Sequence, residues 1–443
     1  MATQLLDSAS SLASKTELDL FHLPPTQIAI ENGWFQEVHL RNTLTSTGPF
    51  EFEMSADSSF TDISRNYVYM VLSVTKKDGS DIDESTSPTS GAAVDYTYSI
   101  INLLGKTFFR QVKLWVGGKL IYDSGDTYHY RAYLETLLNY SKQAKQTHLQ
   151  AAGYYHDTAG MMESKTATGF RIRARLIDGS RKFELLAPLH GGLFNQERLL
   201  LSNLPMRLEL HRNPDELLIT APAGTDYKLQ LHDMSFFIRR VEPLKSLVLG
   251  LETYLGRESA KYPVRRVLMR VLPVEVGRKD LQPTLISNGQ LPRRVIFGLV
   301  AQDAYHGDFK RNPLAFNHYN LKEYKVVAGG LTFPRDDVTM DFANGLYAKA
   351  FLQMFEALNI IGGDRSNGID YFAFANGFGI YGVDLSPDGF DGGHWQLLKS
   401  GAAYLKLEFS VATTNALKVI VFIEYDNLIE VSRHRAVTHD FEI

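Results

Sequence analysis

Hydrophobic and polar residues alternate most clearly near the end of the chain, between residues 392 and 431. Residues 405–410 read Leu, Lys, Leu, Glu, Phe, Ser, which is the period of a strand buried on one face. The run 419–423 is apolar at every position. Such a strand must be covered on both faces. The pattern therefore predicts a large β-structure with this run in its interior.

Strand patterns also fill the first half of the chain. Gly117-Gly118 separates two alternating runs, which predicts a β-hairpin over 108–122. After Asp126, interpreted as an N-cap, the apolar residues from Tyr130 to Leu138 recur at helical spacing and predict a helix. The other strands predicted in this half are 27–30, 34–40, 50–54, 67–74 and 227–241.

The second half repeats this order. Gly329-Gly330 again joins two alternating runs, 212 residues after Gly117, and a helical stripe follows over 347–358. Two further pairs of segments match in the same order, at offsets of 201 and 199 residues: 190–194 with 392–395, and 208–210 with 407–409. Solenoid repeats span only about 20–50 residues. The long offset therefore predicts two copies of one domain.

The repeat sets the predicted domain organisation. We place the junction near Pro243, with an N-terminal arm over 1–22, a first domain over 23–242 and a second over 243–443. A β-sandwich of about eight strands avoids open edges most readily as a jelly roll. The spacing alone does not distinguish a jelly roll from other kinds of β-sandwich. The interpretation is an all-β protein with two tandem eight-stranded jelly-roll β-sandwiches and a few helices in loops.

Composition narrows the function classes. The 443 residues include no cysteine, which excludes disulfides, thiol catalysis and zinc sites built from cysteine. A net charge of −4 argues against a dedicated nucleic-acid-binding protein. The first residues lack a basic leader, and no run of 18 apolar residues occurs. We expect a soluble protein made inside the cell, with no transmembrane segment.

Motifs for chemistry are weak throughout. Gly105-Lys106-Thr107 resembles the end of a phosphate-binding loop, but Ile100 stands where that loop needs glycine, and Phe108 begins a strand. The sequence contains no G-x-S-x-G or H-E-x-x-H motif, and His434 and His439 lack a supporting carboxylate pattern. We therefore predict no catalytic, cofactor-binding or metal-binding residues, no cofactor, and a protein that is not an enzyme.

Charged segments of the chain suggest binding sites, but in each case a solvated surface is the preferred interpretation. The acidic loops 78–84 and 384–391 could supply Ca²⁺ ligands, but neither has EF-hand spacing, so solvated loops are the preferred interpretation. Segment 257–311 holds eleven Lys and Arg against five acids. It could contact nucleic acid or an acidic subunit, although a solvated strand face is preferred. Arg171, Arg173 and Arg175, spaced by two, predict one basic strand face.

Four long segments resemble the double jelly-roll major capsid proteins of Polinton (Maverick) elements and adintoviruses. They are AKYPVRRV (260–267), GQLPRRVIFGLVAQDAYHGDFKRNPLAFNHYNL (289–321), GGDRSNGIDYFAFANGFGIYGVDLSPD (362–388) and VIVFIEYDNLIEVSRHR (419–435). One departure is Gly382, close to Phe378-Gly379-Ile380, where a more regular strand with bulkier residues is expected. In the first half, the assignment depends on the repeat.

The resemblance implies a structural role in a virion. Members of the family carry two jelly rolls per chain and form homotrimers, so six similar domains make a pseudo-hexameric capsomer. These capsomers tile an icosahedral shell around double-stranded DNA, assembled inside the host cell. The implied partners are neighbouring capsomers, a penton protein and minor capsid proteins. The packaged DNA is a further implied partner, through non-specific contact. Duplication lets a three-fold assembly present six similar edges to its neighbours.

A different class remains as the alternative. A tandem β-sandwich that binds carbohydrate, or a glycosidase-like protein, would carry exposed aromatic residues and paired carboxylates in a groove. For the polar arm over 1–22, we expect contacts with neighbouring capsomers or with the shell interior, because such a segment has little reason to pack on its own domain.

Overall fold

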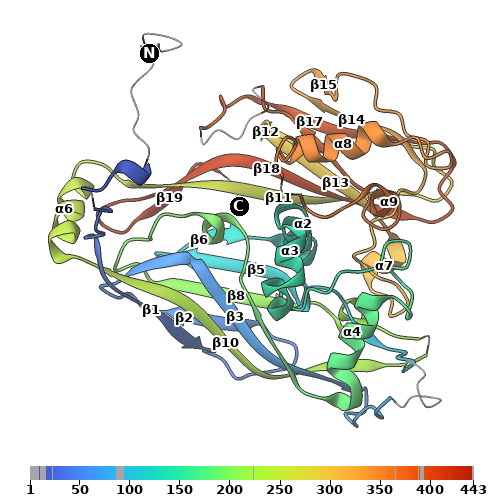
Figure 1. The fold of residues 1–443 in the computed structure, drawn as a ribbon, viewed down its shortest axis with the longest axis horizontal. Helices are drawn as coiled ribbons and strands as arrows, with labels where there is room; N and C mark the ends of the chain where they lie inside the picture. The colour runs from blue at the N-terminus through green and yellow to red at the C-terminus, as the bar shows by residue number, and fades with distance from the viewer. Residues whose placement is uncertain are drawn as a thin grey trace.

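Two β-sandwiches, one from each half of the chain, make up the computed structural model (Figure 1). Each sandwich has two antiparallel sheets, and in the first half both sheets have four strands. The first sheet has the order β1 (Ile30–His39), β10 (Tyr227–Pro243), β3 (Phe60–Lys76), β7 (Phe183–Ala187), and the second β2 (Phe50–Met54), β8 (Met206–Arg212), β5 (Phe109–Val116), β6 (Lys119–Asp123). The described residues are 9, 16–21, 23–85, 94–222, 224–364, 366–387, 389 and 394–441.

The second half repeats this arrangement. One sheet has the order β11 (Ala260–Val274), β18 (Leu417–Val431), β13 (Arg294–Ala301), β16 (Ile380–Asp384), with β19 (Val437–His439) paired to β18. The other has the order β12 (Asp280–Gln290), β17 (Ser400–Phe409), β14 (Leu321–Ala328), β15 (Leu331–Phe333). A separate small sheet joins β4 (Ser99–Ile100) and β9 (Ile219–Thr220).

The strand order identifies the sandwich. In each half the first long strand pairs with the last, β1 with β10 and β11 with β18, so the chain wraps around itself and its ends meet in one sheet. The second strand pairs with the penultimate long strand, β2 with β8 and β12 with β17. Nested pairing of this kind is the jelly-roll topology. Two tandem eight-stranded jelly rolls, predicted from the sequence repeat, are thereby confirmed, and the short strand β19 is an addition to the second.

The matching hairpins explain the sequence repeat. Gly117 and Gly118 have φ of 59° and 78°, and Gly329 and Gly330 have φ of 58° and 81°. A two-residue hairpin turn with positive φ at both positions favours glycine because a side chain is strained there. Segments 208–210 and 407–409 lie in the equivalent strands β8 and β17. The Gly392-Gly393 pair lies outside the described residues.

Helices occupy the connections between strands. They are α1 (Leu104–Thr107), α2 (Tyr128–Asn139), α3 (Lys142–Gln146), α4 (Thr168–Ile177), α5 (Asp215–Leu218), α6 (Lys245–Leu255), α7 (Gln302–His306), α8 (Ala348–Ala357) and α9 (Tyr371–Ala375). The single-turn 3₁₀ helices are η1 (Thr16–Leu18), η2 (Gly125–Thr127), η3 (His148–Ala152), η4 (Asp178–Ser180) and η5 (Gly192–Asn195). Within the described part of the chain, no helix has the length and apolar character needed to cross a membrane.

Some local predictions were wrong. The N-cap of α2 is Thr127 and not Asp126, which lies within η2. Only Ile30 of the segment 27–30 is in a strand, because the Gln27 side chain accepts a hydrogen bond from the Ile30 amide (2.8 Å) and closes a turn. Gly382 lies in β16, and a Cβ there would be 2.6 Å from the Ala357 Cβ. The glycine therefore lets α8 pack closely on this strand.

The basic strand predicted at Arg171, Arg173 and Arg175 is a helix, α4. Residues two apart on a helix differ by about 200° around its axis. Arg171 and Arg175 therefore share one side, where Arg175 is exposed, and Arg173 points to the opposite side and is buried. A period of two over only three charged residues cannot separate a strand from a helix.

Strand β18 is covered on both faces, as predicted. On the inner face, Phe297 of β13 packs edge-on against Tyr324 of the facing sheet, with ring centroids 5.3 Å apart. Ile420 pairs with Gly298, so both point to the outer face. A Cβ on Gly298 would lie 2.4 Å from Cδ1 of Phe316, which shows that Phe316 covers this face. The doubly apolar run is thus enclosed by the sandwich core and by the segment that carries Phe316.

Gly298 provides a test of this close contact. The Gly298→Ala variant should lose about 1–3 kcal/mol of unfolding free energy, because the added methyl overlaps the Phe316 ring. Gly250, in α6, has open space at its Cβ position, so Gly250→Ala is the matched control and should be neutral or slightly stabilising. Urea unfolding of both variants measures the difference, and equal midpoints would contradict the contact.

Candidate functional site

Helix α2 lies between the two sandwiches (Figure 1). All its residues from Tyr128 to Leu138 are buried. The Tyr130 ring stacks on Tyr305, with centroids 5.9 Å apart, and the Tyr133 ring stacks on Phe316 at 6.2 Å. Tyr305 and Phe316 belong to the second half. A helix from the first half therefore forms part of the core of the second half.

Lys145, in α3, links the C-terminal end of α2 to the second half through hydrogen bonds. Its Nζ donates hydrogen bonds to the backbone oxygens of Leu137 and Asn367, each at 2.5 Å. The Leu137 carbonyl is one of those that the last turn of α2 leaves without an intrahelical partner. Burial lowers the pKa of Lys145 to about 7. The side chain thus satisfies a helix end and joins the halves in one contact.

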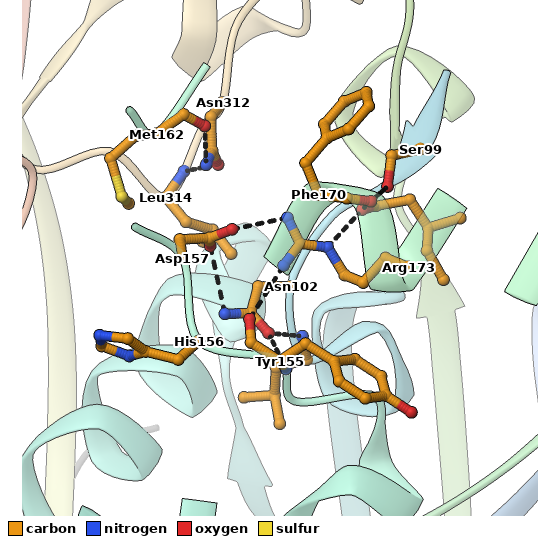
Figure 2. A network of polar contacts seen from close by, with 12 residues as sticks. Ser99, Asn102, Tyr155, His156, Asp157, Met162, Phe170, Arg173, Asn312 and Leu314 are labelled. Carbon is orange, nitrogen blue, oxygen red and sulfur yellow. Dashed lines mark hydrogen bonds and ion pairs between the residues drawn. The ribbon is translucent and has the colours of Figure 1, made fainter. Parts of the chain in front are cut away.

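A second buried network surrounds Arg173 (Figure 2). Its guanidinium donates from Nη2 to Asp157 Oδ1 (2.6 Å), from Nε to the Ile100 oxygen (2.8 Å) and from Nη1 to the Tyr155 oxygen (2.9 Å). The side chains of Arg173 and Asp157 are 4% and 2% exposed. Burying two charges is costly, and paired hydrogen bonds on every side offset that cost.

Asn102 completes the network (Figure 2). Its Nδ2 donates to Asp157 Oδ2 (3.2 Å), and its Oδ1 accepts from the amides of Leu103 (2.9 Å) and Tyr155 (2.8 Å). The network therefore ties α4 to two loop segments of the first half. It fixes the position of these segments and leaves no reactive group free.

A third buried network contains Lys106, the residue singled out by the Gly105-Lys106-Thr107 motif. Lys106 lies in the short helix α1 and is fully buried, so it cannot cradle a phosphate from solvent. Its Nζ lies 3.1 Å from Thr136 Oγ1 and 3.0 Å from His190 Nε2. Burial lowers the pKa of Lys106 to about 7. This environment makes Lys106 part of a polar network in the interior of the first half.

The same network continues to a carboxylate. His190 Nδ1 lies 3.2 Å from Glu135 Oε2, and Arg131 Nε donates to Glu135 Oε1 at 3.0 Å. Burial raises the pKa of Glu135, but Arg131 and His190 more than offset this effect and bring the pKa down to about 2. Burial, together with the nearby Lys106, lowers the pKa of His190. A neutral His190 can thus accept a hydrogen bond from Lys106 at Nε2, while its Nδ1 faces the Glu135 carboxylate.

A cavity of about 730 Å³ borders this network. His190 and Tyr140 line one side, with their rings nearly parallel and 6.0 Å apart. Tyr67 of β3 and Leu186 of β7 line another. Both side chains point to the outer face of the β1-β10-β3-β7 sheet. The cavity is therefore at a surface that the chain itself leaves partly open.

The other charged segments are held by local contacts. In the loop 78–84, Asp78 accepts from the Ser80 amide (2.9 Å) and Asp83 pairs with Lys76 (3.3 Å). Asp384 accepts from the Ser386 amide (2.9 Å), whereas Asp388 and Asp391 lie outside the described residues. Among the residues with described positions, no cluster of three or more His, Asp or Glu side chains could hold a metal ion.

The basic segment 257–311 is partly neutralised within the chain. Arg294 pairs with Glu424 (2.7 Å), Arg293 with Asp426 (3.4 Å) and Arg311 with both Glu163 and Asp303 (3.0 Å each). Each pair joins the segment to another part of the fold or to itself. These cations therefore contribute to structure.

Sequence reasoning missed the three buried networks. Nothing in the local patterns around Asp157 or His190 marks them as buried, because their partners are 16 and 55–84 residues away in the chain. The burial of α2 was missed as well. Its apolar stripe predicts one buried side, whereas Arg131 and Glu135 on the other side suggest a solvated face, yet both are buried.

A curated protein resembles the chain over most of its length. No protein-family model matches the chain. An uncharacterized protein of Caenorhabditis elegans is 27% identical over 413 residues, which cover 92% of this chain and 96% of that protein.

Solved structures resemble the whole chain. A chain of the Sputnik virophage has a TM-score of 0.62 at 10% identity, covering 100% of this chain and 95% of its own. The mavirus major capsid protein has 0.59 at 9% identity, covering 99% and 97%. The Faustovirus major capsid protein has 0.55 at 10% identity, covering 96% and 93%. At such low identity the likeness concerns the fold, and it extends over both halves. The chain therefore has the double jelly-roll fold.

Proposed function

We propose that this chain is a major capsid protein that acts by self-assembly, of the type found in Polinton (Maverick) elements and adintoviruses. Three copies form a pseudo-hexameric capsomer, and capsomers tile an icosahedral shell around double-stranded DNA. The observation that carries the proposal is the duplicated jelly roll, which matches viral major capsid proteins across both halves. Duplication gives a trimer six similar edges.

The narrower assignment has its own support. This support is the resemblance of the four long segments between residues 260 and 435 to the capsid proteins of these elements. In this assignment the protein is located in the virion, assembles inside the host cell, and has a penton protein and minor capsid proteins as partners. The two jelly rolls comprise residues 23–242 and 243–443, and the role is structural and not enzymatic.

The N-terminal arm, residues 1–22, is proposed to contact neighbouring capsomers or the shell interior. Three apolar side chains in its described part, Leu18, Leu20 and Phe21, are 72%, 77% and 92% exposed. Large apolar side chains that are this exposed to solvent and lie close together are typical of contact surfaces. Deletion of the arm should reduce particle yield or the thermal stability of particles, and unchanged values of both would contradict this role.

Assembly is the direct test of the proposed function. The purified full-length chain should be trimeric at micromolar concentration by light scattering and should form shells visible by electron microscopy. The expected mass is three times 49.9 kDa for the capsomer. A stable monomer that forms no particles would overturn the proposal.

The carbohydrate-binding or glycosidase-like alternative is not favoured. A glycosidase needs two carboxylates across a groove, about 5–10 Å apart. The cavity beside His190 has a single carboxylate in its lining, Glu135, and Arg131 and His190 already hold it. Binding of the purified chain to a glycan array would revive this alternative.

A further inference from the structure

We propose that the start of β1 in one copy packs against the β14-β15 hairpin and the segment 394–399 of another copy, and that Trp34 enters a cavity between them. This inference rests on the proposed self-assembly and identifies the two surfaces that meet. The pairing follows from the internal repeat, because the equivalent contact, between the first half and the start of β11, already exists within the chain.

Within the chain, the start of β11 packs on the first half. Tyr262 and Val264 are buried in the hydrophobic core of the first half, and η5 lies against β11. The Tyr262 hydroxyl donates to the Leu199 oxygen and accepts from the Leu201 amide, each at 3.2 Å. Both leucines lie in the connection between β7 and β8. This connection of the first half therefore receives the first strand of the second half.

The equivalent connection of the second half runs between β16 and β17 and is open. In the first half, the apolar side chains of this connection are buried, among them Phe194, Leu200 and Leu201. In the second half, the apolar side chains are 52%, 87% and 72% exposed at Trp395, Leu397 and Leu398. Leu331, in the adjoining β14-β15 hairpin, is also exposed. Nothing in the described part of the chain covers this surface.

The first strand of the first half is open as well. Strand β1 is equivalent to β11, because each pairs with the last long strand of its half. At the start of β1, Ile30 and Trp34 are 38% and 40% exposed. In Figure 1, β1 and β15 lie on opposite sides of the molecule, so the two open surfaces cannot meet within one chain. A second copy can bring them together.

The same kind of contact then alternates around the assembly. Within a chain, the first half receives the first strand of the second half. Between copies, the second half receives the first strand of the next first half. A contact of this kind is heterologous, and heterologous contacts form a closed ring when the rotation permits. Three chains with two halves each give a ring of six positions.

A cavity of about 210 Å³ at the receiving surface suits a tryptophan. Its walls are mainly apolar, with side chains that include Leu291, Leu331, Phe333, Leu397 and Leu398. Asp426 and Ser386 also line it, and among the described residues Asp426 Oδ2 and Ser386 Oγ are buried without a hydrogen-bond partner. A buried acceptor without a donor is costly. The indole of Trp34 combines a large apolar ring with one N–H donor, so it fills the apolar space and satisfies one of these oxygens.

Cross-linking tests the contact cleanly because the natural chain has no cysteine. The double variant Trp34→Cys with Leu398→Cys, treated as assembled full-length protein with a short bifunctional maleimide, should give covalent dimers and trimers on a denaturing gel. Each single variant should stay monomeric on the gel. The control pair is Lys77→Cys with Leu398→Cys. Lys77 is exposed at the other end of the same sheet, about 40 Å from Trp34, so this pair should not cross-link.

The strength of assembly gives an independent measurement. Trp34→Ala should raise the protein concentration needed for half-assembly by about tenfold or more, as expected for a tryptophan buried at an interface. Leu398→Glu changes the opposite surface and should weaken assembly similarly. Trp115→Ala is the matched control, because Trp115 lies in β5, on the other sheet of the first sandwich, and it should leave assembly unchanged.

Thermal unfolding of each variant, with the cysteine variants reduced, verifies that it is folded. Trimers that neither cross-link through the Trp34–Leu398 pair nor weaken with Trp34→Ala and Leu398→Glu would overturn this inference and leave the proposed function intact. A natural chain that remains monomeric would overturn both.

Discussion

Replacing Arg173 by methionine should lower the free energy of unfolding by about 3–5 kcal/mol, the cost of leaving a buried charge without its partner. The Asp157 carboxylate would lose its 2.6 Å ion pair, and only the Asn102 hydrogen bond would remain to it. Two backbone oxygens, those of Ile100 and Tyr155, would also lose their donors. Urea unfolding followed by tryptophan fluorescence measures the change.

Arg175 supplies the matched control. It lies in the same helix, α4, two residues from Arg173, and it is exposed. Arg175→Met should therefore change the unfolding free energy by no more than about 0.5 kcal/mol. If both variants unfold at the same urea concentration, the Arg173 network does not stabilise the fold.

A double variant separates the ion pair from the surrounding hydrogen bonds. Arg173→Met combined with Asp157→Leu removes both charges, so it should be more stable than Arg173→Met alone. Recovery will be partial, because Asn102 Nδ2 donates to Asp157 and would be left without an acceptor. A double variant less stable than either single variant would show that the charges are not the main source of the loss.

The strand pattern could be predicted because it depends on neighbouring residues. Alternation along 405–410 and the apolar run 419–423 report which faces are buried, and these became β17 and the core of β18. The Gly-Gly pairs were recognisable because their turn requires positive φ at two successive residues. Most of the β-structure can therefore be predicted from local steric and solvation rules. The same rules reveal the repeat that indicates two sandwiches.

The polar networks could not be predicted, because they depend on contacts between distant segments. Arg173 resembled one of three solvent-facing arginines, yet its helix turns it toward Asp157. Lys106 followed a glycine in a phosphate-loop-like motif, yet α1 buries it against Thr136 and His190. In both cases the decisive partner comes from another part of the first half. Local propensity holds no information about such a partner.

The buried Lys106 should make stability depend on pH. Burial lowers the pKa of Lys106 from 10.5 to about 7 in the folded chain. Between these values the unfolded chain holds a proton on this amine and the folded chain does not, so the free energy of unfolding rises with pH. The expected slope from this group is about 1.4 kcal/mol per pH unit between pH 7.5 and 9.5.

Comparison of variants isolates this contribution. Lys106→Met removes the titrating amine, so the difference in unfolding free energy between natural chain and variant should change with pH by that slope. The many tyrosines of the chain contribute equally to both proteins and cancel in the difference. Lys119, exposed beside the Gly117-Gly118 turn, is the control, and Lys119→Met should leave the pH profile unchanged. A constant difference between the natural chain and Lys106→Met over this range would contradict the prediction.

Acid should weaken the same network further. The pKa of His190 is below its ordinary value of 6.5 in the folded chain, so the unfolded chain takes up its proton first as the pH falls through 6.5. The pKa of Glu135 is lowered to about 2, so the stability that its ion pairs contribute is fully present above pH 4.5 and is lost as the pH falls toward 2. Both groups therefore reduce stability at low pH.

His190→Gln tests the histidine step, because glutamine keeps a hydrogen-bonding side chain but does not titrate. The natural chain should lose unfolding free energy faster than this variant between pH 6.5 and 5, whereas both should lose it similarly below pH 4.5, where Glu135 takes up its proton on unfolding. Chemical unfolding at half-unit pH steps resolves the two ranges. Equal losses of unfolding free energy by the natural chain and by His190→Gln between pH 6.5 and 5 would show that protonation of His190 does not cause the change.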